Sequence, residues 1–259
     1  MGSTLSSNQV NTYSRFSRSG LHIVIVAALS LFGLEAATQA APKAKVSKDT
    51  FDFGIVSQRA ICTRNFWVKN PGTEPFKIAR IDAGCSCTQI PMPDSLIRPG
   101  DSIPLGITFS SGSFLGITAK RPKFWIEGDS TEYVLKIYAN VTRDTALFRP
   151  VLPTPIQVDI SQFGTKERRK ATFSLTNLTN LPYKISVADN NGKSVTVSVP
   201  KTIPPMGKVE CSLTVTPEAF ATDFKESITL SFDDPDATKL TIPYKRLYRP
   251  NAAPGTSSK

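Results

Sequence analysis

"FWVKNPGTEPFKI", Phe66 to Ile78, decides the fold of this chain because it lies without a gap over "FSLTNLTNLPYKI", Phe173 to Ile185. The aligned stretches share the opening Phe, the Asn, the Pro and the closing Lys-Ile pair. Self-similarity at a fixed spacing indicates a repeated structural unit. Two copies of one unit are the simplest explanation.

The same alignment extends outward from this stretch. It places "FDF" at Phe51 over "VDI" at Val158, and with one residue of slippage "IRPGDSIPLGITF" falls over "IPPMGKVECSLTV". Each copy then spans about 100 residues, which is the usual size of an immunoglobulin-like sandwich.

Both copies show the alternation of β-strands. "SIPLGITF" and "KVECSLTV" place apolar residues at every second position, and the chain's 20 prolines and 15 glycines punctuate such runs. We therefore predict an all-β protein of two tandem immunoglobulin-like β-sandwich domains after an N-terminal signal segment. The predicted boundaries are a signal peptide at 1–40, a first domain at 43–143, a linker at 144–152, a second domain at 153–247 and a disordered tail at 248–259.

The shared asparagines are interpreted as turn builders. Asn70 precedes Pro71 and Gly72, a combination that supplies a side-chain acceptor, a fixed φ and a small residue. In the second copy Asn177 begins a polar turn without the glycine. Ligand binding is the weaker reading of both positions.

The N-terminus has the order of a secretory signal. Arg15 and Arg18 precede the 14-residue apolar run Leu21 to Leu34, and small residues follow up to Ala40. A spanning helix takes about 20 residues, so cleavage after Ala40 is favoured over a permanent anchor. The expected location is periplasmic or extracellular, with tethering by an uncleaved signal as the alternative.

Cleavage would leave a basic protein without histidine. Removing Arg15, Arg18 and Glu35 leaves 29 basic and 20 acidic side chains, a net charge of +9, and it also removes His22, the only histidine. Catalysis that uses a histidine base, and histidine metal ligation, are then excluded. We expect no enzyme activity and no cofactor.

Four motifs of the first copy resemble one exported bacterial family. "FDFGIV", "FWVKNPG", "CSCT" and "RPGDS", in that order, are similar to the pattern of the family called domain of unknown function 1573. The resemblance covers about residues 45 to 141 and implies an immunoglobulin-like fold of the Hydin type in the bacterial envelope. Ser86 stands where that pattern has a glycine, which would shift the segment if the glycine adopts positive φ.

The four cysteines divide between the copies. Cys211 matches Leu105 and is expected to be buried as a small hydrophobic residue. In an oxidising compartment we expect a structural disulfide from Cys62 to Cys85 or Cys87, which would contribute about 3 kcal/mol. Cysteines separated by one residue rarely pair with each other.

Two other readings of the cysteines remain open. Cys85 and Cys87 with Cys62, either alone or together with the thioether of Met92, offer soft ligands for copper(I) or zinc. Alternatively, Cys85 and Cys87 take part in thiol–disulfide exchange.

Partner binding has its own candidate residues. Trp67 alternates out of phase with Phe66 and Val68, and the run "KERRK" contains Lys166, Arg168 and Arg169. An envelope protein or an anionic glycan would suit these residues, whereas nucleic acid and a membrane span after cleavage are not expected. We predict a non-enzymatic binding or scaffolding protein of the bacterial cell envelope, with a thiol-redox or copper-handling protein acting through Cys85 and Cys87 as the alternative.

Overall fold

The computed structural model describes residues 42–190 and 192–251. In this part of the chain the regular structure is β-strand, apart from one 3-10 turn, η1 (Thr145–Leu147). No helix in the described ranges is long and apolar enough to cross a membrane. The all-β prediction is confirmed, while the expected signal segment lies outside the described residues.

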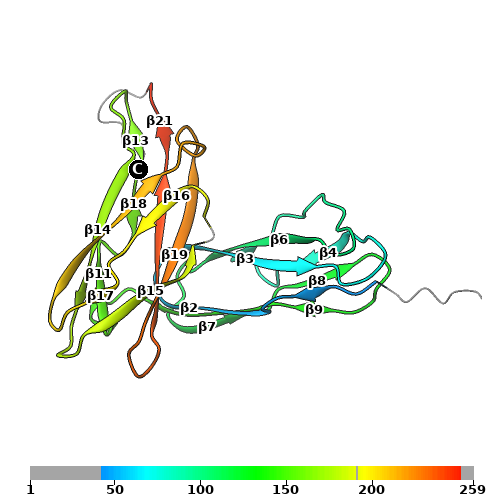
Figure 1. Ribbon diagram of the computed structural model, residues 1–259, viewed down its shortest axis with the longest axis horizontal. Helices are drawn as coiled ribbons and strands as arrows, with labels where there is room; N and C mark the ends of the chain where they lie inside the picture. Colours follow the sequence, from blue (N-terminus) through cyan, green and yellow to red (C-terminus); the bar gives the residue numbers. More distant parts are fainter. Residues whose placement is uncertain (1–41, 191, 252–259) are drawn as a thin grey trace, which may run out of the picture. The chain divides into compact units, whose positions relative to one another are not determined.

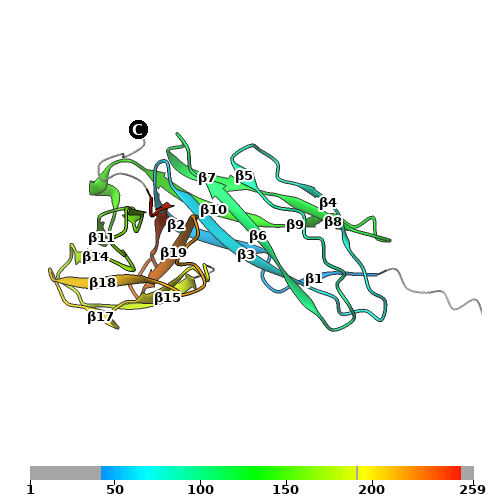
Figure 2. The ribbon, with the colours of Figure 1, turned by 90° about the horizontal axis from the view of Figure 1, so that it is seen from above.

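The first module consists of ten strands in two layers (Figures 1 and 2). One sheet has the order β1-β3-β6-β5, and the facing strands are β2, β10 and β7 together with a three-stranded sheet β4-β8-β9. The strands are β1 (Lys45–Val46), β2 (Thr50–Ser57), β3 (Ile61–Lys69), β4 (Ile78–Asp82), β5 (Thr88–Gln89), β6 (Ser102–Ser110), β7 (Gly116–Lys120), β8 (Lys123–Ile126), β9 (Tyr133–Val134) and β10 (Lys136–Thr142).

The second module repeats this plan. One sheet has the order β11-β14-β18-β16, and β17, β15, β19, β20 and β12 form the other. The strands are β11 (Val151–Thr154), β12 (Val158–Asp159), β13 (Gln162–Phe163), β14 (Lys170–Asn177), β15 (Tyr183–Asn190), β16 (Val195–Ser198), β17 (Thr202–Ile203), β18 (Lys208–Val215), β19 (Phe224–Phe232), β20 (Lys239–Arg246) and β21 (Tyr248–Arg249).

Equivalent residues of the two copies pair in the same way in both modules. Phe66 of β3 pairs with Leu105 of β6, and their counterparts Phe173 and Cys211 pair in β14 and β18. Parallel pairing also recurs, because Phe51 opposite Ile137 corresponds to Val158 opposite Tyr244. The two modules therefore share their registers as well as their sequence pattern.

Each module has its own hydrophobic cluster. Alternate residues of the strands point inward, as expected for a sheet with one buried face. Cys211 is buried among apolar side chains, as its match with Leu105 predicts. The buried clusters run from Phe51 to Val141 in the first module and from Phe148 to Tyr244 in the second.

Gly54, the glycine of "FDFG", is explained by a close backbone approach. Its φ is +65°, and a Cβ atom there would lie 2.1 Å from the carbonyl oxygen of Lys239. Because Gly54 has no side chain, β2 can pair in parallel with β20, with Ile55 opposite Leu240. The pairing joins strands of both modules into one eight-stranded sheet.

Polar contacts accompany this pairing. The Thr63 amide donates to the Ser227 hydroxyl at 3.0 Å, and the Thr241 hydroxyl donates to the Phe53 carbonyl at 2.6 Å. The Arg64 guanidinium pairs with the buried carboxylate of Asp189. Burial raises the pKa of Asp189 to about 6, against the opposing effect of Arg64.

Two expected boundary segments contain ordered elements. The segment 144–152, predicted as a linker, contains η1 and the first residues of β11. The prediction of disorder from residue 248 is wrong for Tyr248 and Arg249, which form β21 and pair with β13 (Figure 1). The Asp223 carboxylate accepts a hydrogen bond from the Tyr248 amide and forms an ion pair with Arg249. These partners are far apart in the sequence, so a local pattern does not predict the contacts.

The turn asparagines make equivalent hydrogen bonds in both modules. Asn70 is fully buried, and its Nδ2 donates to the carbonyls of Glu74 at 2.7 Å and Ile97 at 2.9 Å. Asn177 is also fully buried and donates to the carbonyls of Leu181 and Pro204. Their reading as turn builders agrees with these bonds.

The turn before each long inner strand contains a residue in the left-handed region. In the first module this residue is Gly100, with φ of +83° and open space around it. Its counterpart in the repeat is Met206, with φ of +48°. A non-glycine residue in this region costs about 1 kcal/mol or more of folding free energy. Met206 therefore lowers the stability of the second module relative to a glycine at the same position.

We expect Asn70→Ala and Asn177→Ala each to lower the free energy of unfolding by about 2 to 4 kcal/mol. Each change removes two donated hydrogen bonds and leaves carbonyl groups without their partner. Chemical denaturation measures the effect. Asn180→Ala, at an exposed position of the same turn, is the matched control and should change stability by less than about 0.5 kcal/mol. Equal effects at positions 177 and 180 would contradict the assignment.

We expect Met206→Gly to raise the free energy of unfolding by about 0.5 to 1 kcal/mol, because relief of the left-handed strain exceeds the entropy that glycine adds to the unfolded chain. The reciprocal change Gly100→Ala should destabilise by a similar amount, since a Cβ there meets no atom within 4 Å and only the backbone is strained. Thermal unfolding of the two variants gives the comparison. Changes of the same sign would refute this account.

Candidate functional site

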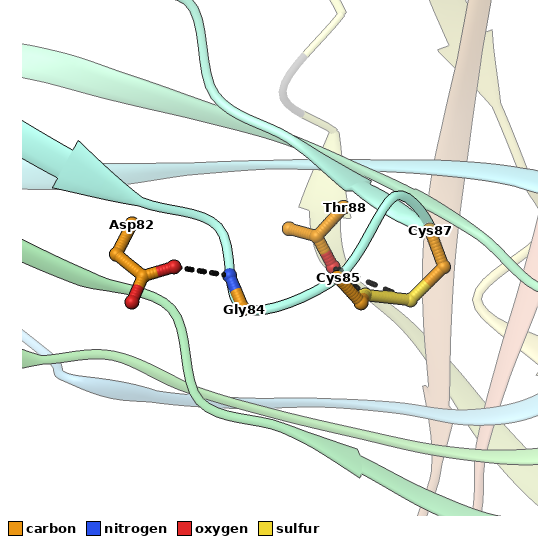
Figure 3. The surroundings of a disulfide bond; sticks show 5 residues. All are labelled: Asp82, Gly84, Cys85, Cys87 and Thr88. Atoms are coloured by element: carbon orange, nitrogen blue, oxygen red, sulfur yellow. Dashed lines mark hydrogen bonds between the residues drawn. A yellow bond between two sulfur atoms is a disulfide. The ribbon is translucent and has the colours of Figure 1, made fainter.

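The loop between β4 and β5 contains a disulfide between Cys85 and Cys87 (Figure 3). The two Cα atoms are 5.2 Å apart, and both residues are half-buried while Ser86 between them is exposed. The bond therefore lies at the surface of the first module and spans a single intervening residue.

Backbone hydrogen bonds hold this loop in place. The Gly84 amide donates to Asp82 Oδ1 at 2.8 Å, and the Thr88 amide donates to the Cys85 carbonyl at 3.2 Å. The Ser110 amide of β6 donates to the Cys87 carbonyl at 2.8 Å. None of these bonds involves a sulfur atom, so the loop is shaped by its backbone as well as by the disulfide.

Ser86 fits this loop without backbone strain. The left-handed residue of the segment is Gly84, with φ of +73°, and Ser86 is not among the described non-glycine residues with positive φ. The substitution of serine for the glycine of the family pattern therefore leaves the loop intact.

A threonine hydroxyl lies next to both sulfur atoms. Thr88 Oγ1 is 3.4 Å from Cys85 Sγ and 3.9 Å from Cys87 Sγ (Figure 3). Thr88 is 3% exposed, so its hydroxyl is held by the surrounding core. It can donate a hydrogen bond to sulfur, and the shorter distance favours Cys85.

The expected bridge from Cys62 to Cys85 or Cys87 is wrong. Cys62 on β3 pairs with Phe109 on β6, and Thr88 on β5 pairs with Phe109 from the other side. Cys62 and the start of β5 are thus two strand spacings apart, about 10 Å. A disulfide requires Cα atoms within about 7 Å, so Cys62 remains a free buried thiol.

The observed disulfide contributes little to stability. In the chain-entropy account a three-residue ring contributes about 1.6 kcal/mol, roughly half of what the expected longer bridge would contribute. It also joins no separate strands. The expectation that neighbouring cysteines do not pair overlooked this turn, which brings the two side chains together.

The remaining cysteines are chemically protected. Burial raises the pKa of the Cys62 thiol far above its ordinary value and that of Cys211 to about 12. Met92 is half-exposed on the chain after β5. Among the described residues no group of three or more His, Cys, Asp or Glu side chains could hold a metal ion.

The partner-binding candidates lie in different modules. Trp67 on β3 is 47% exposed, whereas Lys166, Arg168 and Arg169 precede β14 in the second module. Arg169 stacks on Phe220 and pairs with Glu167, and the Arg168 carbonyl accepts from the buried Arg246. Arg168 and Arg169 of the basic run therefore make contacts within the second module, which is a structural role.

Strand β7 is a surface that the sequence reading missed. It pairs with β10 on one side and ends its sheet, so no described strand pairs with its other side (Figure 2). Ile117 on this strand is 86% exposed and Leu115 just before it is 58% exposed. In the sequence, the apolar residues of "FLGIT" (114–118) do not follow the period-two alternation of a half-buried strand, and this could have indicated an exposed apolar edge.

The segment that leads into β7 is firmly anchored. The Gln58 side-chain amide donates to the carbonyls of Ser113 and Phe114, at 2.9 and 3.2 Å. The Phe114 ring stacks with Phe109 and lies 4.2 Å from Lys120 Nζ. The free strand edge is therefore preorganised.

A surface hollow adjoins Ile117. Its volume is about 480 Å³, and its lining includes Tyr138 and Asn140 of β10 and the backbone at Gly54. The lining also contains Asp52, Arg149, Asp236 and Lys239, which differs from the mostly apolar lining that is typical of small-molecule pockets.

Comparison with known families agrees with the two-module structure. Residues 44–141 match the family model described as a protein of unknown function, DUF1573, and residues 150–244 match the HYDIN/CFA65/VesB-like Ig-like domain. The resemblance drawn from the four motifs of the first copy is confirmed. No curated protein matches the chain.

Similar solved structures include a protein of unknown function from Porphyromonas gingivalis W83, 13% identical, covering 78% of this chain and 98% of its own, with a TM-score of 0.34. PapD-like domain 7 of human CEP192 is 11% identical over 44% of this chain and 94% of its own, with a TM-score of 0.35. The CupB2 chaperone of Pseudomonas aeruginosa is 10% identical over 77% and 98%, with a TM-score of 0.29. These values are too low to carry an inference about function.

The sandwich geometry, the shared registers and the two family matches lead to one assignment. Residues 44–141 form an Ig-like β-sandwich module similar to the DUF1573 family, and residues 150–244 form one similar to the HYDIN/CFA65/VesB-like Ig-like domain.

Proposed function

We propose that this protein is a non-enzymatic binding module of the bacterial cell envelope that captures an extended segment of another exported protein along β7. The single observation that carries the proposal is the free edge of β7 with Ile117 86% exposed. The Ig-like domain matches support a binding or scaffolding role.

An exposed apolar edge strand is unusual in a protein that works alone. Unpaired N–H and C=O groups template pairing with another chain, and natural proteins usually block such edges with charges, prolines or bulges. Among residues 116–120 the only charged side chain is Lys120 at the end. An added strand would pair with this backbone and cover Ile117.

The second module supports this reading by comparison. The repeat places the first half of β19, before Ile228, at the position of β7, because Ile78 opposite Ile126 corresponds to Ile185 opposite Phe232. There Ser227 accepts a hydrogen bond from the Thr63 amide of β3. The second module therefore has a side-chain contact with β3 just beyond the positions equivalent to β7, whereas no described strand pairs with the free side of β7.

Charge favours a partner over a second copy. The chain carries +10 overall and +9 after the expected cleavage, and Lys120 ends β7 with Arg121 directly after it. Two like-charged copies repel each other, whereas an acidic extended segment is attracted, more strongly at low salt. We therefore assign the partner as a polypeptide with alternating apolar and acidic residues.

A photo-crosslinking amino acid at position 117 should form an adduct with a polypeptide in the envelope fraction of the producing cell. The physical reason is that an added strand lies about 5 Å from β7. Mass spectrometry of the digested adduct reads the partner sequence, and the expected segment is extended, apolar at alternate positions and acidic.

The matched control carries the same amino acid at Leu181, an apolar position of the second module that is 58% exposed. It should give no adduct with the same segment. Crosslinks from position 181 alone, or adducts at 117 made only with a second copy of this chain, would refute the assigned partner.

Export gives a separate expected outcome. The apolar run at Leu21 to Leu34 and the small residues before Ala40 motivate cleavage after Ala40. The intact mass of protein from the envelope fraction should correspond to a chain that begins at Ala41. An intact mass that includes Met1 would support the tethered alternative, and recovery from the cytosol would contradict export.

A further inference from the structure

We propose that the Cys85–Cys87 disulfide undergoes thiol–disulfide exchange with a dithiol of another exported protein, with Thr88 assisting the leaving sulfur. This goes beyond binding along β7 and uses a different part of the first module. It rests on the position of the bond, the anchoring of its loop and the hydroxyl next to it.

The position of the disulfide suits exchange better than structural bracing. Both cysteines are half-buried on a surface loop and the bond joins residues two positions apart. Disulfides that solvent can reach are more labile than buried ones, and this bond is partly accessible and connects no distant segments of the fold. Opening this bond separates no strands of the sandwich.

The loop remains preorganised when the bond opens. The Gly84, Thr88 and Ser110 amides donate to acceptors that are not sulfur. The loop would therefore keep its backbone hydrogen bonds after reduction, so the exchange does not require the first module to rearrange.

The distances from the Thr88 hydroxyl to the two sulfur atoms indicate which sulfur atom the substrate thiolate attacks. Its hydroxyl is 3.4 Å from Cys85 Sγ and 3.9 Å from Cys87 Sγ, and a better stabilised thiolate leaves faster. Attack of a substrate thiolate on Cys87 Sγ then expels Cys85 as the thiolate that accepts a hydrogen bond from Thr88.

The complete exchange balances as follows. The first attack forms a mixed disulfide between the substrate and Cys87 and breaks the Cys85–Cys87 bond. The second substrate thiolate attacks the substrate sulfur of this mixed disulfide and releases Cys87 as a thiolate. Two electrons pass to this protein, the two substrate thiol protons end on Cys85 and Cys87, and the substrate gains one disulfide.

The other two thiols stay out of this exchange. Cys62 and Cys211 are buried in separate cores, at 0% and 2% exposure. Thiolate is the reactive form, and burial in apolar surroundings suppresses it. The chain therefore presents one reactive pair and two silent thiols.

The test uses the full exported chain, purified without reductant, and a synthetic peptide that carries two reduced cysteines. We expect one peptide disulfide per protein molecule, with Cys85 and Cys87 becoming open to alkylation and Cys62 and Cys211 remaining protected. The circular dichroism spectrum of the folded protein should not change.

Three variants define the part played by Thr88. Thr88→Val should slow the exchange about fivefold, the effect of losing one hydrogen bond of ordinary strength. Thr88→Ser, which keeps the hydroxyl, should react at the wild-type rate. Thr108→Val, which removes a hydroxyl from neighbouring β6, is the matched control and should also leave the rate unchanged.

Three outcomes would overturn the proposal. The bond could resist the peptide in the folded protein and react only after unfolding, or its reduction could unfold the first module. A rate for Thr88→Val equal to that of Thr108→Val would remove Thr88 from the reaction. The crosslinking test at Ile117 does not require the disulfide to open, so failure of the exchange is distinguishable from failure of the proposed binding.

Discussion

The structure depends on one buried asparagine amide in each module. Asn70 donates to the carbonyls of Glu74 and Ile97, and so joins the turn after β3 to the segment before β6. The joined segments determine which residues of β3 face those of β6, because the side-chain period of a strand is two and a shift by one residue would reverse the faces. The inward positions of Phe66 on β3 and of Phe173 on β14, the strand that ends at Asn177, follow from this register.

The features that could be predicted from the sequence are those that depend on local pattern or on the internal repeat. Matching Phe66 with Phe173 and Leu105 with Cys211 predicts two similar cross-strand pairs, and both are present. Period-two alternation also predicts the buried faces of the long strands. Each of these features depends on neighbours along the chain or on the comparison of one copy with the other.

The site was predicted less well because it depends on sheet order. Cys62 and Cys87 look like partners while β3 and β5 are assumed to be adjacent, but β6 lies between them. The open edge of β7 was missed for the same reason, because it also depends on the order and length of strands in the sheet. Strand β4 ends at Asp82 and pairs only with β8, so it does not extend along β7. A local sequence pattern does not indicate where a neighbouring strand ends.

The disulfide loop and the edge of β7 lie in the same module, and we expect them to act independently. Packed side chains connect them, since Thr88 lies opposite Phe109, Phe109 stacks with Phe114, and Phe114 contacts Lys120. Such a chain transmits a change only if its members have two discrete arrangements. Phe109 is fully buried, and the Cys87 carbonyl accepts a hydrogen bond from the Ser110 amide that does not involve either sulfur atom. We therefore expect Phe109 to stay in place when the disulfide opens, and the edge of β7 to be available to a partner in both redox states.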